Sequence, residues 1–127
     1  MPHFIVEYPH ELAQHAAIPA LLAQACATLA AQGGVFPLGG IRARAIPTRH
    51  HRVAGPGGAA FVHATLKIGY GRTQETKRKV FDELFGLLQD HFRAAAALPP
   101  LSVSMELYEF DEAGTYKLNN VHARFRR

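Results

Sequence analysis

Short apolar runs and two longer stretches with helical periodicity alternate along this chain, and proline or glycine residues separate most of them. Four runs are rich in β-branched and aromatic residues or alternate apolar with polar positions, which is typical of strands. These predicted strands cover residues 3–8, about 41–46, 60–68 and 101–110. Pro9, Pro47 and the Pro99-Pro100 pair stand beside three of the runs and mark their boundaries.

Two amphipathic helices are predicted between these strands, because apolar residues recur there at intervals of three and four. The first begins near Pro19, where proline suits the first turn, and ends before Gly33-Gly34. The second follows Thr73, a good N-cap residue, and runs to about residue 96. The predicted apolar faces are Pro19, Leu22, Cys26 and Leu29 in the first helix, and Val80, Leu84, Leu87, Leu88, His91, Phe92 and Ala95 in the second.

The remaining segments lack a regular period. Residues 10–16 predict a turn or short helix, residues 48–59 a polar loop, and residues 116–125 a short terminal strand or an arm.

The order of elements is β-α-β twice, in halves of about 2–47 and 60–110 that share a pattern but little residue identity. This predicts one α+β domain, residues 1–127, with a four-stranded mixed sheet and both helices on one face. Ile5, Val62 and Leu66 would then leave the other face apolar and uncovered. A single layer of this size is expected to form an oligomer.

Composition fits this picture, since 127 residues with 48% hydrophobic and 19% charged residues make one ordinary globular domain. The one cysteine, Cys26, excludes an intramolecular disulfide and reads as a small buried apolar residue. Residues 12–41 contain no Asp, Glu, Lys or Arg, but Glu7 and the absence of any Lys or Arg before Arg42 argue against a secretory signal. Polar residues and Pro19 interrupt the stretch, so no membrane span is expected and the sequence predicts a cytoplasmic protein.

The N-terminal Met1-Pro2 pair carries the first candidate chemistry. Proline directly after the initiator is usually exposed by removal of Met1, which leaves a secondary amine as the N-terminus. At the beginning of a buried strand near cations, such an amine would have a lowered pKa and could act as a base near neutral pH. Met-Pro alone has little specificity, because proline fills about one position in twenty.

Two arginines follow glycine-containing turns and form the second candidate. Arg42 comes after Gly39-Gly40-Ile41, and Arg72 after Gly69-Tyr70-Gly71. A guanidinium group offers a planar fork that matches a carboxylate. An isolated arginine is most often a solvated charge, but these two fall at corresponding places near the outer ends of the predicted sheet. The net charge of +4 also favours anionic partners.

The histidines indicate no metal centre. His50-His51 has no third ligand at a suitable spacing, and the loop around it reads as solvated. His63 and His122 alternate with apolar residues in predicted strands, where a structural histidine is the better interpretation. No nucleophile constellation, Walker motif or dinucleotide motif is present.

Several spaced motifs resemble those of the 5-carboxymethyl-2-hydroxymuconate isomerase family, a branch of the tautomerase superfamily that also contains 4-oxalocrotonate tautomerase. They span essentially the whole chain in order: Met1-Pro2-His3-Phe4-Ile5-Val6-Glu7, Phe36-Pro37-Leu38, Gly40-Ile41-Arg42, Phe61-Val62-His63, Leu66-Lys67-Ile68-Gly69, Gly71-Arg72 and Asn119-Asn120-Val121-His122-Ala123. The loop at 48–59 carries no family motif.

The resemblance implies a homotrimer of tandem βαβ units with active sites at subunit contacts. It also implies cofactor-free isomerisation of a polycarboxylate in homoprotocatechuate degradation. Pro2 would take a proton from the 2-hydroxyl group of the dienol and return one at C5, while Arg42 and Arg72 would hold carboxylates and stabilise charge on the C2 oxygen.

Two other functions remain open from the sequence. Another activity of the superfamily, such as phenylpyruvate enol–keto tautomerisation, would use the same Pro2. A small basic nucleic-acid-binding domain would suit the sheet and a pI near 9.6, but no run of interleaved basic, glycine and aromatic residues is present. We therefore expect no nucleic-acid or membrane partner.

Overall fold

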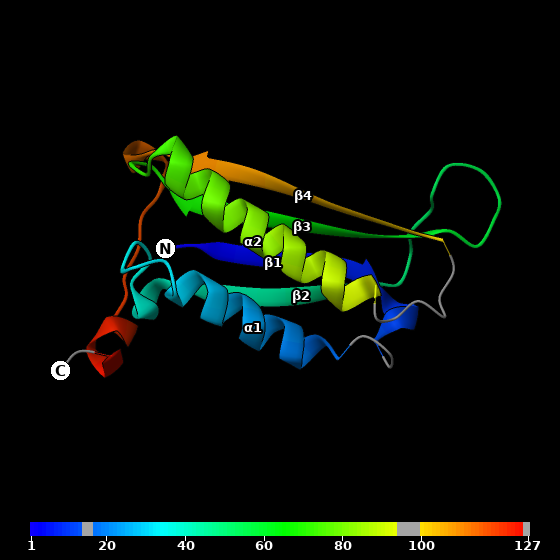
Figure 1. Cartoon of the computed structure of the whole chain (residues 1–127), viewed down its shortest axis with the longest axis horizontal. Helices are drawn as coiled ribbons and strands as arrows, with labels where there is room; N and C mark the ends of the chain where they lie inside the picture. Colours follow the sequence, from blue (N-terminus) through cyan, green and yellow to red (C-terminus); the bar gives the residue numbers. More distant parts are fainter. Residues whose placement is uncertain (14–16, 94–99, 126–127) are drawn as a thin grey trace.

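The computed structural model describes residues 1–13, 17–93 and 100–125, which form one sheet with two helices on one side (Figure 1). The four strands are β1 (His3–Pro9), β2 (Arg42–Thr48), β3 (Ala60–Gly69) and β4 (Leu101–Phe110), and the helices are α1 (Ile18–Ala30) and α2 (Gln74–Arg93). Each predicted strand and helix is present. Parts of two predictions, at residues 14–16 and 94–96, lie outside the described residues.

The sheet is mixed, with the strand order β2-β1-β3-β4. β1 pairs with β2 and β3 pairs with β4 in parallel, while β1 and β3 are antiparallel. Because of this antiparallel centre, the starts of β1 and β2 lie at the same end of the sheet as the ends of β3 and β4. We call this the N-terminal end of the sheet.

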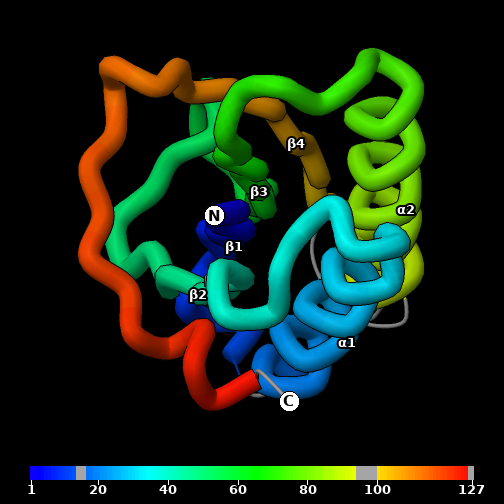
Figure 2. Tube along the Cα trace, turned by 90° about the vertical axis from the view of Figure 1, so that its left-hand side faces the viewer, coloured from blue at the N-terminus to red at the C-terminus, as the bar shows by residue number. Residues whose placement is uncertain are grey.

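Both helices cover one face of the sheet (Figure 2), and the core fills the space between them. Four of the seven residues predicted for the apolar face of α2 are buried, while Leu87 and His91 are half-buried and Ala95 lies outside the described residues. In α1 the buried face is rotated by one position except at Leu29, because the chain there is apolar all round and fixes no unique phase. Cys26 is therefore half-buried, and the prediction of a buried cysteine was wrong. The buried helix residues are Ile18, Leu21, Ala25 and Leu29 in α1, and Val80, Leu84, Leu88 and Phe92 in α2.

The opposite face is more polar than predicted. Val62 and Leu66 are fully buried under the helices, so of the three expected residues only Ile5 lies on the open face. The strand alternation places His63 there instead, with Nδ1 2.7 Å from Ser104 Oγ and Nε2 2.8 Å from Glu106 Oε1. His63 is thus a structural histidine with both ring nitrogens partnered, as predicted.

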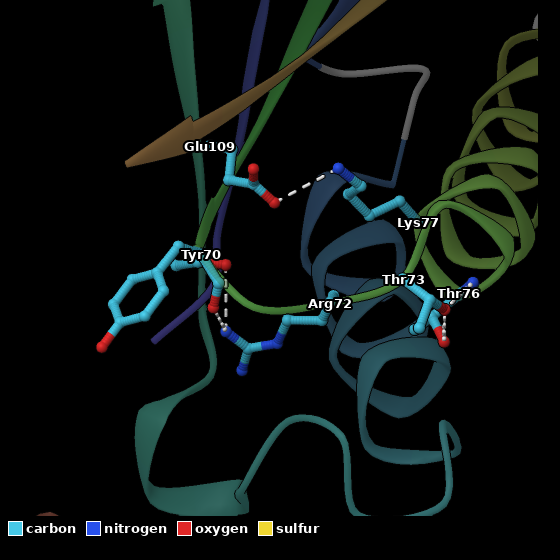
Figure 3. A network of polar contacts seen from close by, with 7 residues as sticks. Tyr70, Arg72, Thr73, Thr76, Lys77 and Glu109 are labelled. Atoms are coloured by element: carbon cyan, nitrogen blue, oxygen red, sulfur yellow. Dashed lines mark hydrogen bonds and ion pairs between the residues drawn. The ribbon is translucent and has the colours of Figure 1, made fainter. Parts of the chain in front are cut away.

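Local signals explain where the helices begin and end. The Thr73 hydroxyl accepts a hydrogen bond from the Thr76 N–H at 3.1 Å and caps α2 (Figure 3). Gly33 and Gly34, after α1, both have positive φ, which glycine adopts without strain. Pro47 lies inside β2 rather than after it, which an edge strand tolerates because one side of it makes no ladder bonds.

The chain after β4 forms an arm rather than a strand. Residues 111–125, here the C-terminal arm, contain two short 3-10 turns, at Glu112–Gly114 and Val121–Phe125. The arm runs across the N-terminal end of the sheet, from the β4 side to the β2 side (Figures 1 and 2). It therefore passes close to the beginning of the chain.

Candidate active site

The start of the chain is built into the sheet. The Arg42 N–H donates a hydrogen bond to the carbonyl oxygen of Pro2 at 3.0 Å, one residue before the β1–β2 pairing begins. The Pro2 side chain is fully buried, and Met1 lies half-buried in front of it. The position of the first predicted site residue is thus fixed by the backbone.

A cavity of about 360 Å³ opens at this end of the sheet, around Met1. Its walls come from the turn before β2, the ends of β3 and β4, the turn before α2, and the C-terminal arm. The lining residues are Met1, Pro37, Gly40, Gly69, Tyr70, Arg72, Phe110, Thr115, Lys117 and His122.

Arg72 is held in this cavity by three carbonyl oxygens and an aromatic ring. Its Nη1 donates to Gly69 at 3.0 Å and to Tyr70 at 3.4 Å (Figure 3), and its Nη2 donates to Val35 at 3.1 Å. The guanidinium carbon lies 5.1 Å from the centroid of the Phe36 ring. These contacts fix the orientation of the guanidinium group before any ligand arrives.

Arg42 lies at the same end of the sheet but is not among the residues that line the cavity. Its Nη1 donates to the carbonyl oxygens of Gly39 and Ile41, both at 3.0 Å. The two arginines do not occupy corresponding places in the repeat, because Arg42 begins the second strand of its half and Arg72 follows the first strand of its own. The antiparallel β1–β3 pair brings these different positions to one end.

The environment of the N-terminus disfavours positive charge. The pKa of the Met1 α-amino group is lowered, first by burial and then by the charges of Lys117, Arg72 and Arg42. An amine at this end of the sheet is therefore biased toward its neutral, proton-accepting form.

Most residues that line the cavity were not assigned to the site from the sequence, among them Tyr70, Phe110, Lys117 and His122. Tyr70 and Phe110 end strand regions, and Lys117 lies in an arm with no periodicity that could place it. His122 was predicted as a structural histidine in a strand, but it lies in a 3-10 turn beside the cavity. The motif at residues 119–123 was the one sequence signal that could have linked the arm to the site.

Asn119 ties the arm to the turn before β2. Its Nδ2 donates to the Gly39 carbonyl at 3.0 Å, and its Oδ1 accepts from the Val121 N–H at 2.7 Å. A Cβ atom at Gly39 would lie 2.6 Å from the Cα of His122, so only glycine allows the arm to pack this closely.

A second cavity, of about 500 Å³, lies at the other end of the sheet, beside the loop at 48–59. His51 lines it, half-buried and edge-on to Phe61 at 5.8 Å, so this part of the loop is less solvated than predicted. Within the described ranges, no group of three or more His, Cys, Asp or Glu residues could hold a metal ion. Every helix in the same ranges is too short or too polar to cross a bilayer.

Comparison with known proteins gives one consistent match. The family model of 5-carboxymethyl-2-hydroxymuconate isomerase covers residues 2–125. The chain is 42% identical over 127 residues to an Escherichia coli 5-carboxymethyl-2-hydroxymuconate Delta-isomerase, covering 99% of this chain and 100% of the relative.

Solved structures agree with this match. A crystal structure of a 5-carboxymethyl-2-hydroxymuconate isomerase from Deinococcus radiodurans R1 has a TM-score of 0.90 and 44% identity, and the match covers 99% of this chain and 95% of that one. A fused 4-OT protein, described as a symmetric trimer, shares the fold at 15% identity and a TM-score of 0.65, with 91% and 93% coverage. This chain belongs to the 5-carboxymethyl-2-hydroxymuconate isomerase family, and it has the tautomerase fold.

Proposed function

We propose that this protein isomerises 5-carboxymethyl-2-hydroxymuconate to 5-carboxymethyl-2-oxo-hex-3-ene-dioate, without a cofactor. Membership in the family supports the reaction, as do relatives of that name at 42% and 44% identity. The structural observation that carries the proposal is the buried start of the chain in a cavity with Arg72, where the amine is biased toward its neutral form. Family membership also favours an enzyme over a nucleic-acid-binding domain.

In this proposal Pro2 is the base, and it becomes one when Met1 is removed. With Met1 attached, the proline nitrogen is an amide and cannot accept a proton. The free amine takes the proton of the 2-hydroxyl group, the electrons move through the diene, and a proton returns to C5 from the same nitrogen. The hydroxyl group at C2 becomes the oxygen of a ketone, and the remaining double bond lies between C3 and C4. Atoms and charge therefore balance.

Arg72 and Arg42 are the proposed cationic groups. Arg72 already faces the cavity and would bind a carboxylate or the developing charge on the C2 oxygen. Within the described residues Arg42 donates side-chain hydrogen bonds through Nη1 alone, which leaves its Nη2 and Nε as donors for a ligand. Both charges lower the pKa of the Met1 amine and would act in the same way on a free Pro2 amine, so they would bind the substrate and also keep the base in its neutral form.

We further propose a homotrimer that works in the cytoplasm, in the degradation of homoprotocatechuate. The trimeric state of the fused 4-OT protein, which has the same fold, supports this assembly. The open face of the sheet and its two edge strands, β2 and β4, provide surfaces for such contacts.

The test is the kinetics of Pro2→Ala beside the parent protein, with intact mass to verify loss of Met1. We expect a fall in kcat of about 100-fold or more, the range for removal of a general acid–base group. Pro56→Ala, in the loop at the far end of the sheet, is the matched control. Wild-type turnover by the processed Pro2→Ala protein would exclude the proline-base mechanism.

A second experiment tests the same mechanism without a substitution. Protein made while methionyl aminopeptidase is inhibited keeps Met1, and we expect it to be folded but inactive. A substrate panel tests the assignment itself, because a clear preference for phenylpyruvate over the muconate would select the alternative tautomerase activity.

A further inference from the structure

Lys117, like Arg72, is a cationic residue that lines the cavity around Met1. It lies in an extended part of the C-terminal arm, where successive side chains alternate in direction. Tyr116 and Leu118, on either side of it, are 98% and 102% exposed, whereas Thr115 also lines the cavity and Asn119 is bonded to Gly39. Lys117, although exposed itself, thus belongs to the face of the arm that lines the cavity.

The arm holds Lys117 in place through its neighbours. The two hydrogen bonds of the Asn119 side chain fix the chain two residues after Lys117. The close packing of His122 against Gly39 fixes the following turn. A lysine on an unattached tail would have no defined position, but the backbone beside Lys117 is held by contacts with the turn before β2.

The charge of Lys117 has no counter-ion in the described part of the protein, where neither an ion pair nor a hydrogen bond engages its Nζ. Instead, Lys117 lies near other positive groups. Of the three side-chain charges that lower the pKa of the N-terminal amine, the charge of Lys117 has the largest effect. Arg72, Arg42 and Met1 are the cationic groups around it, and His122 lines the same cavity. Positive groups gathered without an acid between them are complementary to an anionic ligand.

We propose that Lys117 binds one carboxylate of the substrate in the cavity it shares with Arg72. The inference rests on the proposed function, because the substrate named there carries three carboxylates. Arg42 and Arg72 account for two of them, and Lys117 supplies the third cation. The C-terminal arm is therefore part of the substrate-binding site.

The experiment compares Lys117→Met, which keeps an unbranched apolar stem, with Lys117→Arg, which keeps the charge. Arg124→Met, an exposed residue of the same arm, is the control. For Lys117→Met we expect kcat/KM on 5-carboxymethyl-2-hydroxymuconate to fall roughly 10- to 100-fold, as for loss of a charge-assisted hydrogen bond. Lys117→Arg should restore most of that loss, and Arg124→Met should match the parent protein.

Two readouts separate a binding role from a structural one. Calorimetry with propane-1,2,3-tricarboxylate, which does not react, should show weaker binding by Lys117→Met than by Arg124→Met. The acid limb of the kcat/KM profile should move to higher pH in Lys117→Met but not in Lys117→Arg or Arg124→Met, because loss of a positive charge raises the pKa of the amine.

Parent-like binding and kinetics of Lys117→Met would overturn the inference. Pro2→Ala, measured in the same series, keeps the two proposals apart. If Pro2→Ala is inactive while Lys117→Met equals the parent, the role of Lys117 alone fails. If Pro2→Ala is fully active, the proposed mechanism fails, and the calorimetric comparison still decides whether Lys117 binds the tricarboxylate.

Discussion

Arg42 and Asn119 donate hydrogen bonds to the same acceptor, the carbonyl oxygen of Gly39, each at 3.0 Å. One donor begins the edge strand β2, and the other lies in the C-terminal arm. The arm is therefore coupled to the arginine side chain through a single backbone atom. Substitution of either donor should therefore change the hydrogen bond that the other makes to this oxygen.

Asn119→Ala tests this coupling. The substitution removes both side-chain hydrogen bonds of Asn119 and should lower the free energy of unfolding by about 1–2 kcal/mol, the usual range for such bonds. Because the arm would no longer hold Lys117 at the cavity, kcat/KM should fall as well. Urea unfolding and steady-state kinetics measure the two effects. Asn120→Ala, at the exposed next position, should change neither; equal losses in both variants would rule out a specific anchor.

Gly39→Ala tests the close approach of the arm to the turn. The new Cβ would lie 2.5 Å from His122 Nδ1 and 2.6 Å from its Cα, and the backbone atom cannot rotate away. We expect a loss of about 1–3 kcal/mol in stability, typical of overpacking, together with displacement of the arm. Gly55→Ala, with no atom within 4 Å of its Cβ, is the control in chemical denaturation. A Gly39→Ala protein as stable as this control would contradict the packing described here.

The pH dependence of activity should report the N-terminal amine. The base must be neutral to accept a proton, so kcat/KM should rise with pH through the pKa of the amine. Burial and nearby cations lower the pKa of the Met1 amine, and we expect them to act in the same way on a free Pro2 amine, so the acid limb should lie below the pKa of an ordinary α-amino group. Arg72→Ala and Arg42→Ala should each move the limb to higher pH while lowering kcat and raising KM. An acid limb unchanged in both variants would exclude these arginines from tuning the base.

The sequence predicted the helices and strands well where apolar residues recurred with a regular period, or where proline or glycine interrupted the pattern. Proline and glycine mark most strand boundaries, and Thr73 caps α2 as expected. The sequence did not show which face of α1 is buried, because this helix is apolar on all sides and carries no charged residue to mark an exposed face. The burial of Val62 and Leu66 depended on which face the helices cover, and strand alternation alone does not specify that.

The candidate site was predictable only in part. Pro2 and Arg72 could be proposed as site residues because a chain start and a glycine turn are local signals. The cavity also needs Lys117 and His122, which reach it through tertiary contacts of an arm with no regular pattern. The shared location of Arg42 and Arg72 follows from the antiparallel β1–β3 pair, so it is a property of strand direction and not of the repeat.

The hydrogen bond from Arg42 to the Pro2 carbonyl has a consequence for how this protein is made. Chain ends usually fray, but this one is ordered as soon as the sheet forms. Anything left in front of Pro2, whether the initiator or an affinity tag, would start inside the cavity and would also convert the amine to an amide. Under the proposed mechanism, the ribosome would then deliver a folded but inactive precursor, and a single proteolytic cut would activate it.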